Sequence, residues 1–399
     1  MKITSVDVIE CKPNVMGKVV CVRINTDCED IYGYGEVGLS YGTAHYAAVG
    51  IARDYGQYII GRDPLKPEAI WESIFRSTFW GMGGGTVINA GMSAIDIALW
   101  DIIGKAYKMP VYQLLGGKSR DTIRAYASQI QFGWGPEHLF LTDPKDYGKA
   151  CEDAMKDGYT AVKVDPMGVT DEGVWAREST NPNWKMRGKL SEKMLDTIYK
   201  RTEAIRKAGG DDMDIIIETH SYPDANTGIQ LGAKLEPLNI FYYEEPCHPL
   251  NYGNMLEVHK ALPRMALASG ERIYTRWGYT PFLENHILQV IQPDITICGG
   301  ISETKKICDM ANTYDAAVQL HICGGPISTA ASLQVEAVIP NFLIHEVHEG
   351  AIKKDMRDLG MYDDIKPVSG QYFVPDRPGI GQELSQKALD EAVNVYTCR

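Results

Sequence analysis

The sequence lacks the features that mark several classes of protein. Its 399 residues contain 40 Lys and Arg against 52 Asp and Glu, a formal net charge of -12. Nucleic acids and anionic membrane surfaces are bound by basic patches, so we expect neither as a partner. No apolar run approaches the roughly 20 residues of a membrane span, and the N-terminus MKITSVDVIECKPN lacks the apolar core of a signal peptide.

The cysteines also exclude a disulfide framework. There are nine, an odd number, scattered along the chain without a C-x-x-C pair, which is typical of reduced thiols in a cytoplasmic protein. The length exceeds that of one small domain and suits a barrel of roughly 200 to 250 residues with a second unit. A hydrophobic content of 44% supplies an ample core.

A regular series of short apolar runs lies between Asp214 and Cys323. Such runs are typical of strands buried on both faces of a parallel sheet. Polar residues end or follow them: Glu218, Glu244, Glu271, Asp294 and His321. The spacings of 26 and 27 residues match one β/α unit of roughly 30 residues. In a barrel the carboxyl ends of the strands share one rim, so we expect these side chains to converge there.

Three of the converging residues are carboxylates: Glu218, Glu244 and Glu271. Like charges at one rim require shifted pKa values or a cation. Hard oxygen ligands, without Cys or a pair of His, favour Mg²⁺. The alternative is that the three glutamates lie in separate surface loops, but their shared spacing favours a magnesium site.

Asp294 and His321 follow the next two strands. An Asp beside a His fixes the imidazole tautomer and raises its basicity, as expected of a general base. A core histidine bonded to a carbonyl is the alternative. The register shared with the carboxylates favours the base.

Two further strand ends carry polar residues in an i, i+2 relationship. Residues two apart on a strand face the same side, so Lys163 and Asp165 of AVKVD both point into the barrel mouth. Lys163 either polarises a substrate carboxylate or forms a salt bridge with Asp165. His220, two residues after Glu218, is either a partner of the metal ligand or a general acid.

A long segment from Pro166 to Leu190, with Trp175 and Trp184, follows the strand that holds Lys163. Loops in β/α units usually have 2 to 6 residues, and loops beyond about 15 are functional or disordered. Two tryptophans argue against disorder. We interpret the segment as a lid or a subunit contact.

The motifs resemble the enolase superfamily, mandelate racemase subgroup. They are Glu244-Glu245-Pro246, Ser269-Gly270-Glu271, Gln292-Pro293-Asp294 before Gly299-Gly300, the later His321, and SAIDIALWD at 93–101. The resemblance covers nearly the whole chain, and the order and spacing of the motifs make it specific.

The resemblance implies an α/β fold, a modified TIM barrel (β/α)7β with an N-terminal α+β capping domain that the C-terminal tail completes. We expect the cap at residues 1–118, the barrel at 119–349 and the returning segment at 350–399. Three alternating runs at the start of the chain agree with an antiparallel meander. In the family the loops of the cap select the substrate, which makes Lys12, Tyr41 and His45 candidate substrate-binding residues.

The resemblance also implies an enzyme. Acid-sugar dehydratases of the subgroup carry an acidic ligand, any residue, then His, as Glu218 and His220 do, although here the ligand is Glu instead of the commoner Asp. Many members carry Lys-x-Lys where this chain has Lys163 and Asp165, which leaves a clear base on one face of the substrate only. Glu346 is implied to bind the substrate carboxylate in its protonated form. We count Asp165 among the substrate-binding residues.

The predicted activity is Mg²⁺-dependent dehydration of an aldonate or aldarate to a 2-keto-3-deoxy acid through an ene-diolate. A racemase, epimerase or cycloisomerase with the same intermediate is the alternative, and a non-catalytic binding protein is a more distant one. Relatives of this kind are usually homo-oligomers, and a small-molecule carboxylate is the expected partner.

Overall fold

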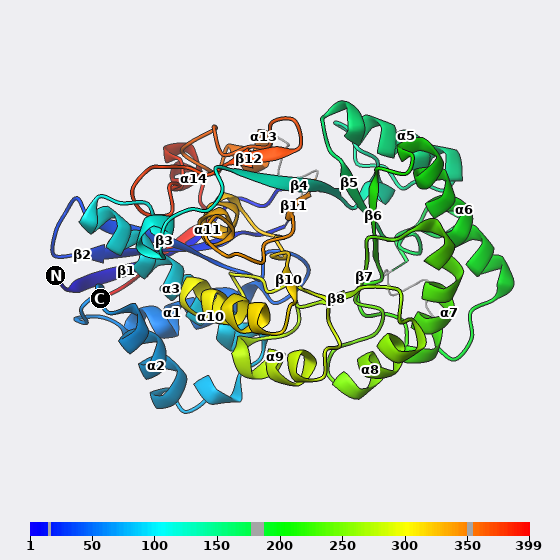
Figure 1. The fold of residues 1–399 in the computed structure, drawn as a ribbon. Helices are drawn as coiled ribbons and strands as arrows, with labels where there is room; N and C mark the ends of the chain where they lie inside the picture. The colour runs from blue at the N-terminus through cyan, green and yellow to red at the C-terminus, as the bar shows by residue number, and fades with distance from the viewer. Residues whose placement is uncertain (15–16, 177–186, 349–353) are drawn as a thin grey trace.

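A computed structural model describes residues 1–14, 17–176, 187–348 and 354–399. It places a four-stranded antiparallel sheet with its helices beside a barrel of parallel strands (Figure 1). The predicted fold class is confirmed. The domain boundaries after residues 118 and 349 stay predictions.

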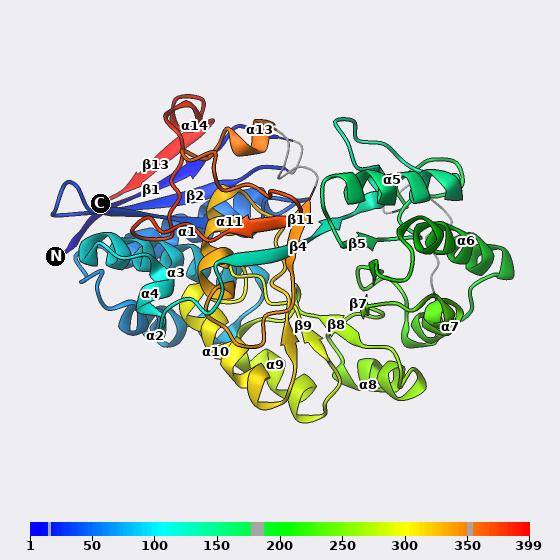
Figure 2. The ribbon, with the colours of Figure 1, turned by 45° about the horizontal axis from the view of Figure 1, so that its top comes forward.

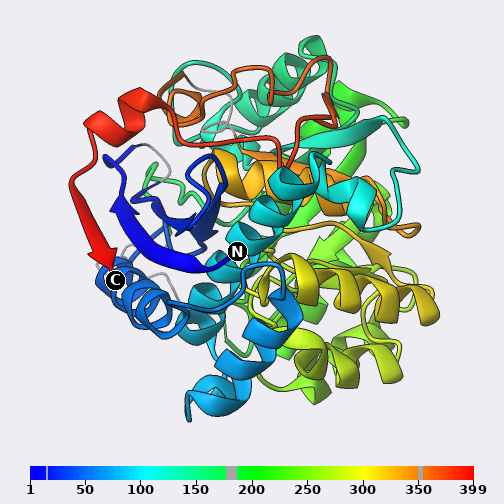
Figure 3. The ribbon, with the colours of Figure 1, turned by 90° about the vertical axis from the view of Figure 1, so that its left-hand side faces the viewer.

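The capping sheet has the strand order β13-β1-β2-β3. Its strands are β1 (Ile3–Glu10), β2 (Val20–Thr26), β3 (Tyr32–Val37) and β13 (Asn394–Cys398). The C-terminal strand β13 pairs with the N-terminal strand β1, so the tail completes the cap (Figures 2 and 3). The tail reaches the cap through α13 (Lys354–Arg357), β12 (Gln371–Phe373) and α14 (Gln386–Asp390).

Helices α1 (His45–Tyr58) and α3 (Thr86–Tyr107) pack on this sheet, and α2 (Pro67–Ser77) and the short α4 (Val111–Leu114) pack against α3. Helix α3 approaches β3 closely because Gly33 and Gly35 have no side chains. A Cβ on Gly33 would lie 2.1 Å from the carbonyl oxygen of Ala98, and one on Gly35 would lie 1.9 Å from that of Ala94.

Helix α3 is long and apolar enough to cross a membrane, with a mean hydropathy of 1.4 over the relevant window. However, 83% of that window is buried inside the protein, as in the core helix of a globular fold. The cytoplasmic location and the homo-oligomeric assembly stay predictions.

The barrel contains eight parallel strands in the order β10-β9-β8-β7-β6-β5-β4-β11. They are β4 (Thr122–Ser128), β5 (Ala161–Val164), β6 (Asp214–Glu218), β7 (Tyr242–Glu244), β8 (Leu267–Ser269), β9 (Val290–Ile291), β10 (Ala317–Val318) and β11 (His345–His348). A parallel bridge between Val318 and Phe342 joins β10 to the segment before β11 and closes the ring.

One helix follows each of the first seven barrel strands in the described chain, as the (β/α)7β pattern requires. They are α5 (Pro144–Lys156), α6 (Glu192–Gly209), α7 (Ala225–Leu235), α8 (Tyr252–Ala261), α9 (Thr275–Glu284), α10 (Gly300–Thr313) and α11 (Pro326–Glu336). Buried side chains fill the interior of the barrel, among them Tyr126, Ile216, Tyr242 and Ile344. The carboxyl ends of the strands, beyond this layer, carry the polar residues of the candidate site.

The cap is attached to the barrel by buried polar contacts. Asp96 of α3 accepts hydrogen bonds from the backbone N–H of Ser302, at 2.9 Å, and from its hydroxyl. Glu36 of β3 accepts from the backbone N–H groups of Gly325 and Ser328, at the start of α11. The second contact lies only a few residues after His321, so the cap helps to fix the rim of the barrel.

Candidate active site

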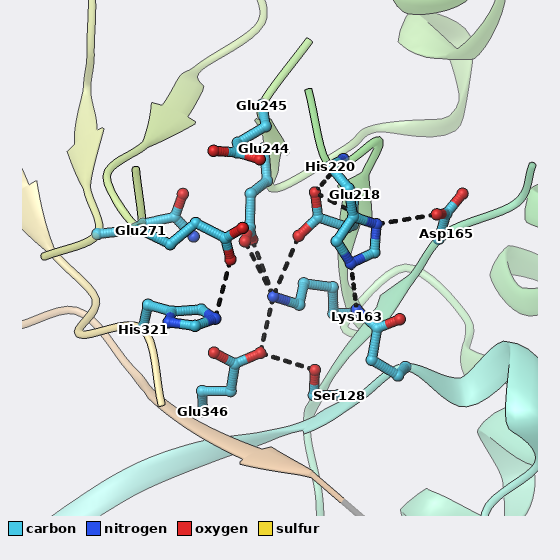
Figure 4. A network of polar contacts seen from close by, with 12 residues as sticks. Ser128, Lys163, Asp165, Glu218, His220, Glu244, Glu245, Glu271, His321 and Glu346 are labelled. Carbon is cyan, nitrogen blue, oxygen red and sulfur yellow. Dashed lines mark hydrogen bonds and ion pairs between the residues drawn. The ribbon is translucent and has the colours of Figure 1, made fainter. Parts of the chain in front are cut away.

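A buried lysine lies at the centre of the polar strand ends (Figure 4). The Nζ of Lys163 is 3.0 Å from Oε1 of Glu244 and 3.4 Å from Oε2 of Glu218. Strand pairing places Glu218 directly beside Glu244. Burial alone would lower the pKa of Lys163, but the surrounding carboxylates raise it well above its usual value. The ammonium is therefore charged, and its partners are glutamates and not Asp165, the alternative considered for Lys163.

The same ammonium also holds Glu346, at 2.7 Å from its Oε1. Glu346 accepts further hydrogen bonds from the Ser128 hydroxyl at 2.8 Å and the backbone N–H of Ile322 at 3.1 Å. Burial would raise the pKa of Glu346, but Lys163 and then His348 hold it well below its usual value. A neighbouring cation thus favours the ionised carboxylate in this structure, and the protonated, substrate-binding role of Glu346 stays a prediction.

The predicted Asp294–His321 pair is present. The Nδ1 of His321 lies 2.8 Å from Oδ2 of Asp294, and its Nε2 lies 2.9 Å from Oε2 of Glu271. Burial would lower the pKa of His321, but the charge of Glu271 and the hydrogen bond to Asp294 hold it well above its usual value. In this arrangement the ring is an imidazolium that donates to both carboxylates. It accepts a proton at Nε2 only after releasing the one it shares with Glu271.

Arg272 joins two glutamates that follow neighbouring strands, β7 and β8. Its guanidinium donates to Glu271 and to the buried Glu245. Burial would raise the pKa of Glu271, but Arg272 and His321 hold it well below its usual value. Burial raises the pKa of Glu245 to about 7 despite the guanidinium. Glu271 is thus an ionised carboxylate held between an arginine and a histidine.

A second histidine–aspartate pair stands across the cluster from His321 (Figure 4). The Nδ1 of His220 lies 2.9 Å from Oδ2 of Asp165, and its Nε2 lies 3.4 Å from Nε2 of Gln129. The backbone N–H of His220 donates to Glu218, which ties the ring to the end of β6. Asp165, predicted to bind substrate, is here the partner of His220.

The three predicted metal ligands do not surround one point in this structure. Among the described residues, no group of three His, Cys, Asp or Glu side chains is arranged to hold a metal ion. Glu218 and Glu244 share the Lys163 ammonium, and Glu271 faces His321 and Arg272.

The donor chemistry nevertheless fits a hard divalent cation. The ammonium between Glu218 and Glu244 shows that a cation is stabilised at this point, and carboxylate oxygens are the ligands that Mg²⁺ prefers. Burial and the charge of Glu244 raise the pKa of Glu218 well above its usual value. Lys163 therefore does not fully neutralise the pair. A three-carboxylate site requires Glu271 to turn away from His321.

The predicted substrate-binding residues of the cap lie in different places. Tyr41 is exposed and follows Ser40, whose hydroxyl donates to the carbonyl oxygen of Cys323, two residues after His321. His45 lies 2.6 Å from Glu10 within the cap. Lys12 is 64% exposed and pairs with Glu391 at 3.2 Å. Of these three described residues, Tyr41 alone is next to a residue that contacts the rim, and the binding roles of all three stay predictions.

Among its described residues, the inserted segment places the Trp175 side chain near the site. Its beginning forms a bridge between Val169 and Trp175, and the Trp175 ring lies edge-on to His220 with ring centroids 6.4 Å apart. Trp184 and the rest of residues 177–186 lie outside the described residues. The choice between lid and subunit contact stays open.

Several residues of the site were missed from the sequence: Ser128, Gln129, Glu245, Arg272 and His348. A signal existed for three of them. Glu245 and Arg272 directly follow proposed ligands, and His348 is two residues after Glu346 on the same strand, hence on the same face. Nothing in the local sequence marks Ser128 or Gln129.

Known protein families match both parts of the chain. Residues 146–388 match the family described as enolase C-terminal domain-like. Residues 10–116 match the N-terminal domain of the mandelate racemase and muconate lactonizing enzyme family. The matches cover the cap and most of the barrel.

Individual proteins are similar over nearly the full chain. The crystal structure of a member of the enolase superfamily from Salmonella Typhimurium is 50% identical, with a TM-score of 0.96 and complete coverage of both chains. A D-galactonate dehydratase from Variovorax paradoxus is 30% identical over 98% of this chain and 94% of its own. An arabinonate dehydratase from Saccharolobus solfataricus is 29% identical over 96% of this chain and 91% of its own.

Proposed function

The chain belongs to the mandelate racemase and muconate lactonizing enzyme family of the enolase superfamily, and from this premise we propose how it works as an acid-sugar dehydratase. The substrate is an aldonate or aldarate and the product a 2-keto-3-deoxy acid. The observation that carries the proposal is the pair of histidines on opposite sides of one carboxylate cluster (Figure 4). Each histidine is bonded to its own aspartate, His321 to Asp294 and His220 to Asp165.

His321 removes the proton from the carbon next to the substrate carboxylate. Its Nδ1 is held by Asp294, so its Nε2 is the atom that accepts the proton. Glu271 contacts that same Nε2 in the structure. Loss of the Glu271 contact lowers the pKa of the ring and prepares the neutral base.

His220 completes the reaction on the other side. Removal of the α-proton gives an ene-diolate, and expulsion of the β-hydroxyl then needs a proton donor because hydroxide is a poor leaving group. Asp165 holds Nδ1 of His220 at 2.9 Å and leaves Nε2 to donate that proton. The resulting enol becomes the 2-keto acid by taking a proton at carbon 3.

Mg²⁺ bound by Glu218, Glu244 and Glu271 would supply positive charge that binds the substrate carboxylate and stabilises the ene-diolate. Lys163 provides a second positive charge among the same carboxylates, and it keeps Glu346 ionised. Ser128 and the backbone N–H of Ile322 fix the orientation of Glu346.

A screen of acid sugars tests this function. We expect the purified protein with Mg²⁺ to convert at least one aldonate or aldarate into a 2-keto acid that semicarbazide detects. No keto acid from any member of the library, combined with exchange of the α-proton in D₂O, would show an isomerase instead.

Metal binding is tested separately from activity. Isothermal titration with Mg²⁺ should show binding to the wild type and a clear loss of affinity in Glu244→Gln. Glu68→Gln is the matched control, because Glu68 pairs with Lys306 on the surface. Equal affinity of all three proteins would remove Glu244 from the ligand set.

A further inference from the structure

Two aromatic side chains from different loops meet beside His220. Phe132 ends the short 3-10 helix η2 (Ile130–Phe132) after β4, and Trp175 lies in the segment after β5. Their ring centroids are 5.0 Å apart, and the Trp175 ring is perpendicular to that of His220 at 6.4 Å. We call Phe132 and Trp175 the aromatic wall.

The backbone holds Trp175 in this position. Trp175 and Val169 form an antiparallel bridge, and the N–H of Ala176 donates to the carbonyl oxygen of Gly168 at 2.8 Å. A Cβ on Gly168 would lie 2.5 Å from a ring atom of Trp175 and 2.9 Å from Cγ of Asp165. The absence of a side chain at Gly168 thus lets the indole pack against the backbone beside the Asp165–His220 pair.

The position of the wall matches one part of the substrate. This step rests on the proposed function, in which His220 protonates the oxygen on carbon 3. Carbon 4 and the rest of the chain then lie within a few bonds of the imidazole, where the aromatic wall stands. Aromatic rings bury large apolar areas, and the C–H groups of a sugar chain present such an area.

The electrostatics near the wall disfavour a second carboxylate. Asp165 beside Trp175 is only 2% exposed. The cations described at the rim are all bonded to carboxylates. Lys163 and Arg272 contact glutamates. The His321 imidazolium contacts Glu271 and Asp294, and His220 contacts Asp165. A distal carboxylate would lose water and meet a like charge, both of which are unfavourable.

We propose that Phe132 and Trp175 form the subsite for the distal carbons of the substrate, and that the enzyme therefore takes an aldonate in preference to the aldarate of the same chain. The wall binds the carbons beyond carbon 4 through their C–H faces. It adds affinity for long aldonates and none for a four-carbon acid, whose chain ends at carbon 4.

Binding to the catalytically blocked His321→Asn protein tests this subsite without turnover. Isothermal titration with Mg²⁺ present would compare a hexonate, the hexarate of the same configuration and a tetronate. We expect the hexonate to bind more tightly than the hexarate. Adding Trp175→Ala should weaken hexonate binding about tenfold because apolar contact is lost. The affinity for the tetronate should not change. Trp175→Phe should retain most of the affinity.

Trp277→Ala is the matched control, because Trp277 is 47% exposed and stacks on Phe75 at 5.0 Å away from this wall. Trp277→Ala should leave the affinities for all three acids unchanged. The subsite would be overturned if the hexarate binds more tightly than the hexonate. It would also be overturned if adding Trp175→Ala to His321→Asn leaves the affinity for the hexonate unchanged. Failure of the proposed dehydration looks different: the affinities follow the stated pattern while the wild type yields no keto acid.

Discussion

The ammonium of Lys163 lies 2.7 Å from the carboxylate of Glu346, deep in the barrel mouth. Both side chains are buried, and the lysine also contacts Glu218 and Glu244. One cation therefore serves three strand ends. This relationship explains why Glu346 is ionised in spite of its burial, and it makes Lys163 the residue on which the charge state of the site depends.

Replacing Lys163 by Met should destabilise the metal-free protein. Loss of one partner from a buried ion pair leaves uncompensated charge and costs about 3–5 kcal/mol of the free energy of unfolding. Urea denaturation in the presence of a chelator measures this change. Lys149→Met is the control, because Lys149 pairs with Asp153 on the surface and such pairs contribute about 0–1 kcal/mol. If both variants lose a similarly small part of the free energy of unfolding, Lys163 does not stabilise the carboxylate cluster.

Asp294→Asn should lower the pKa of His321 in the metal-free protein, since the hydrogen bond to Asp294 helps to raise it. A raised histidine pKa contributes stability that is fully present below the ordinary value of 6.5 and is lost as the pH rises through the folded value. The wild type should therefore exceed the variant in free energy of unfolding most at about pH 6 and less at about pH 9.

The exposed Asp309→Asn is the control for this series, because Asp309 pairs only with Lys305 among its described contacts. Its difference from the wild type should not depend on pH in this way. A constant difference between wild type and Asp294→Asn across the range would show that Asp294 does not set the charge of His321.

Glu36 should give the protein a second, separate pH dependence. Burial raises its pKa from 4.5 to about 7, although two backbone N–H groups of α11 lower it. A raised carboxyl pKa contributes stability that is fully present below 4.5 and is lost as the pH rises through about 7. The melting temperature of the wild type should fall relative to that of Glu36→Gln between about pH 5 and about pH 8. If the melting temperatures of the two proteins change with pH in the same way, Glu36 does not carry this pH dependence.

The fold and the composition of the site could largely be predicted from the sequence. The apolar runs predicted the barrel strands. Their spacing predicted that Glu218, Glu244, Lys163 and His321 lie at one rim. The i, i+2 rule placed Lys163 and Asp165 in the same mouth. These features depend on strand periodicity, which is a local property of the chain.

The pairing of the charges could not be predicted. Strand register says which side chains meet at a rim, but not which carboxylate takes which cation. Lys163 contacts three glutamates on other strands and not Asp165, which is only two residues away. Asp165 contacts His220 instead. Such choices depend on side-chain reach and burial across the barrel, as does the contact of Trp175 with Phe132.

Hydrogen exchange tests the division of labour between the two histidines most directly. With a substrate acid sugar and Mg²⁺ in D₂O, His220→Asn should still replace the α-proton by deuterium but release hardly any keto acid. His321→Asn should lose both exchange and dehydration. If His220→Asn abolishes exchange while His321→Asn retains it, the assignment of base and acid is contradicted.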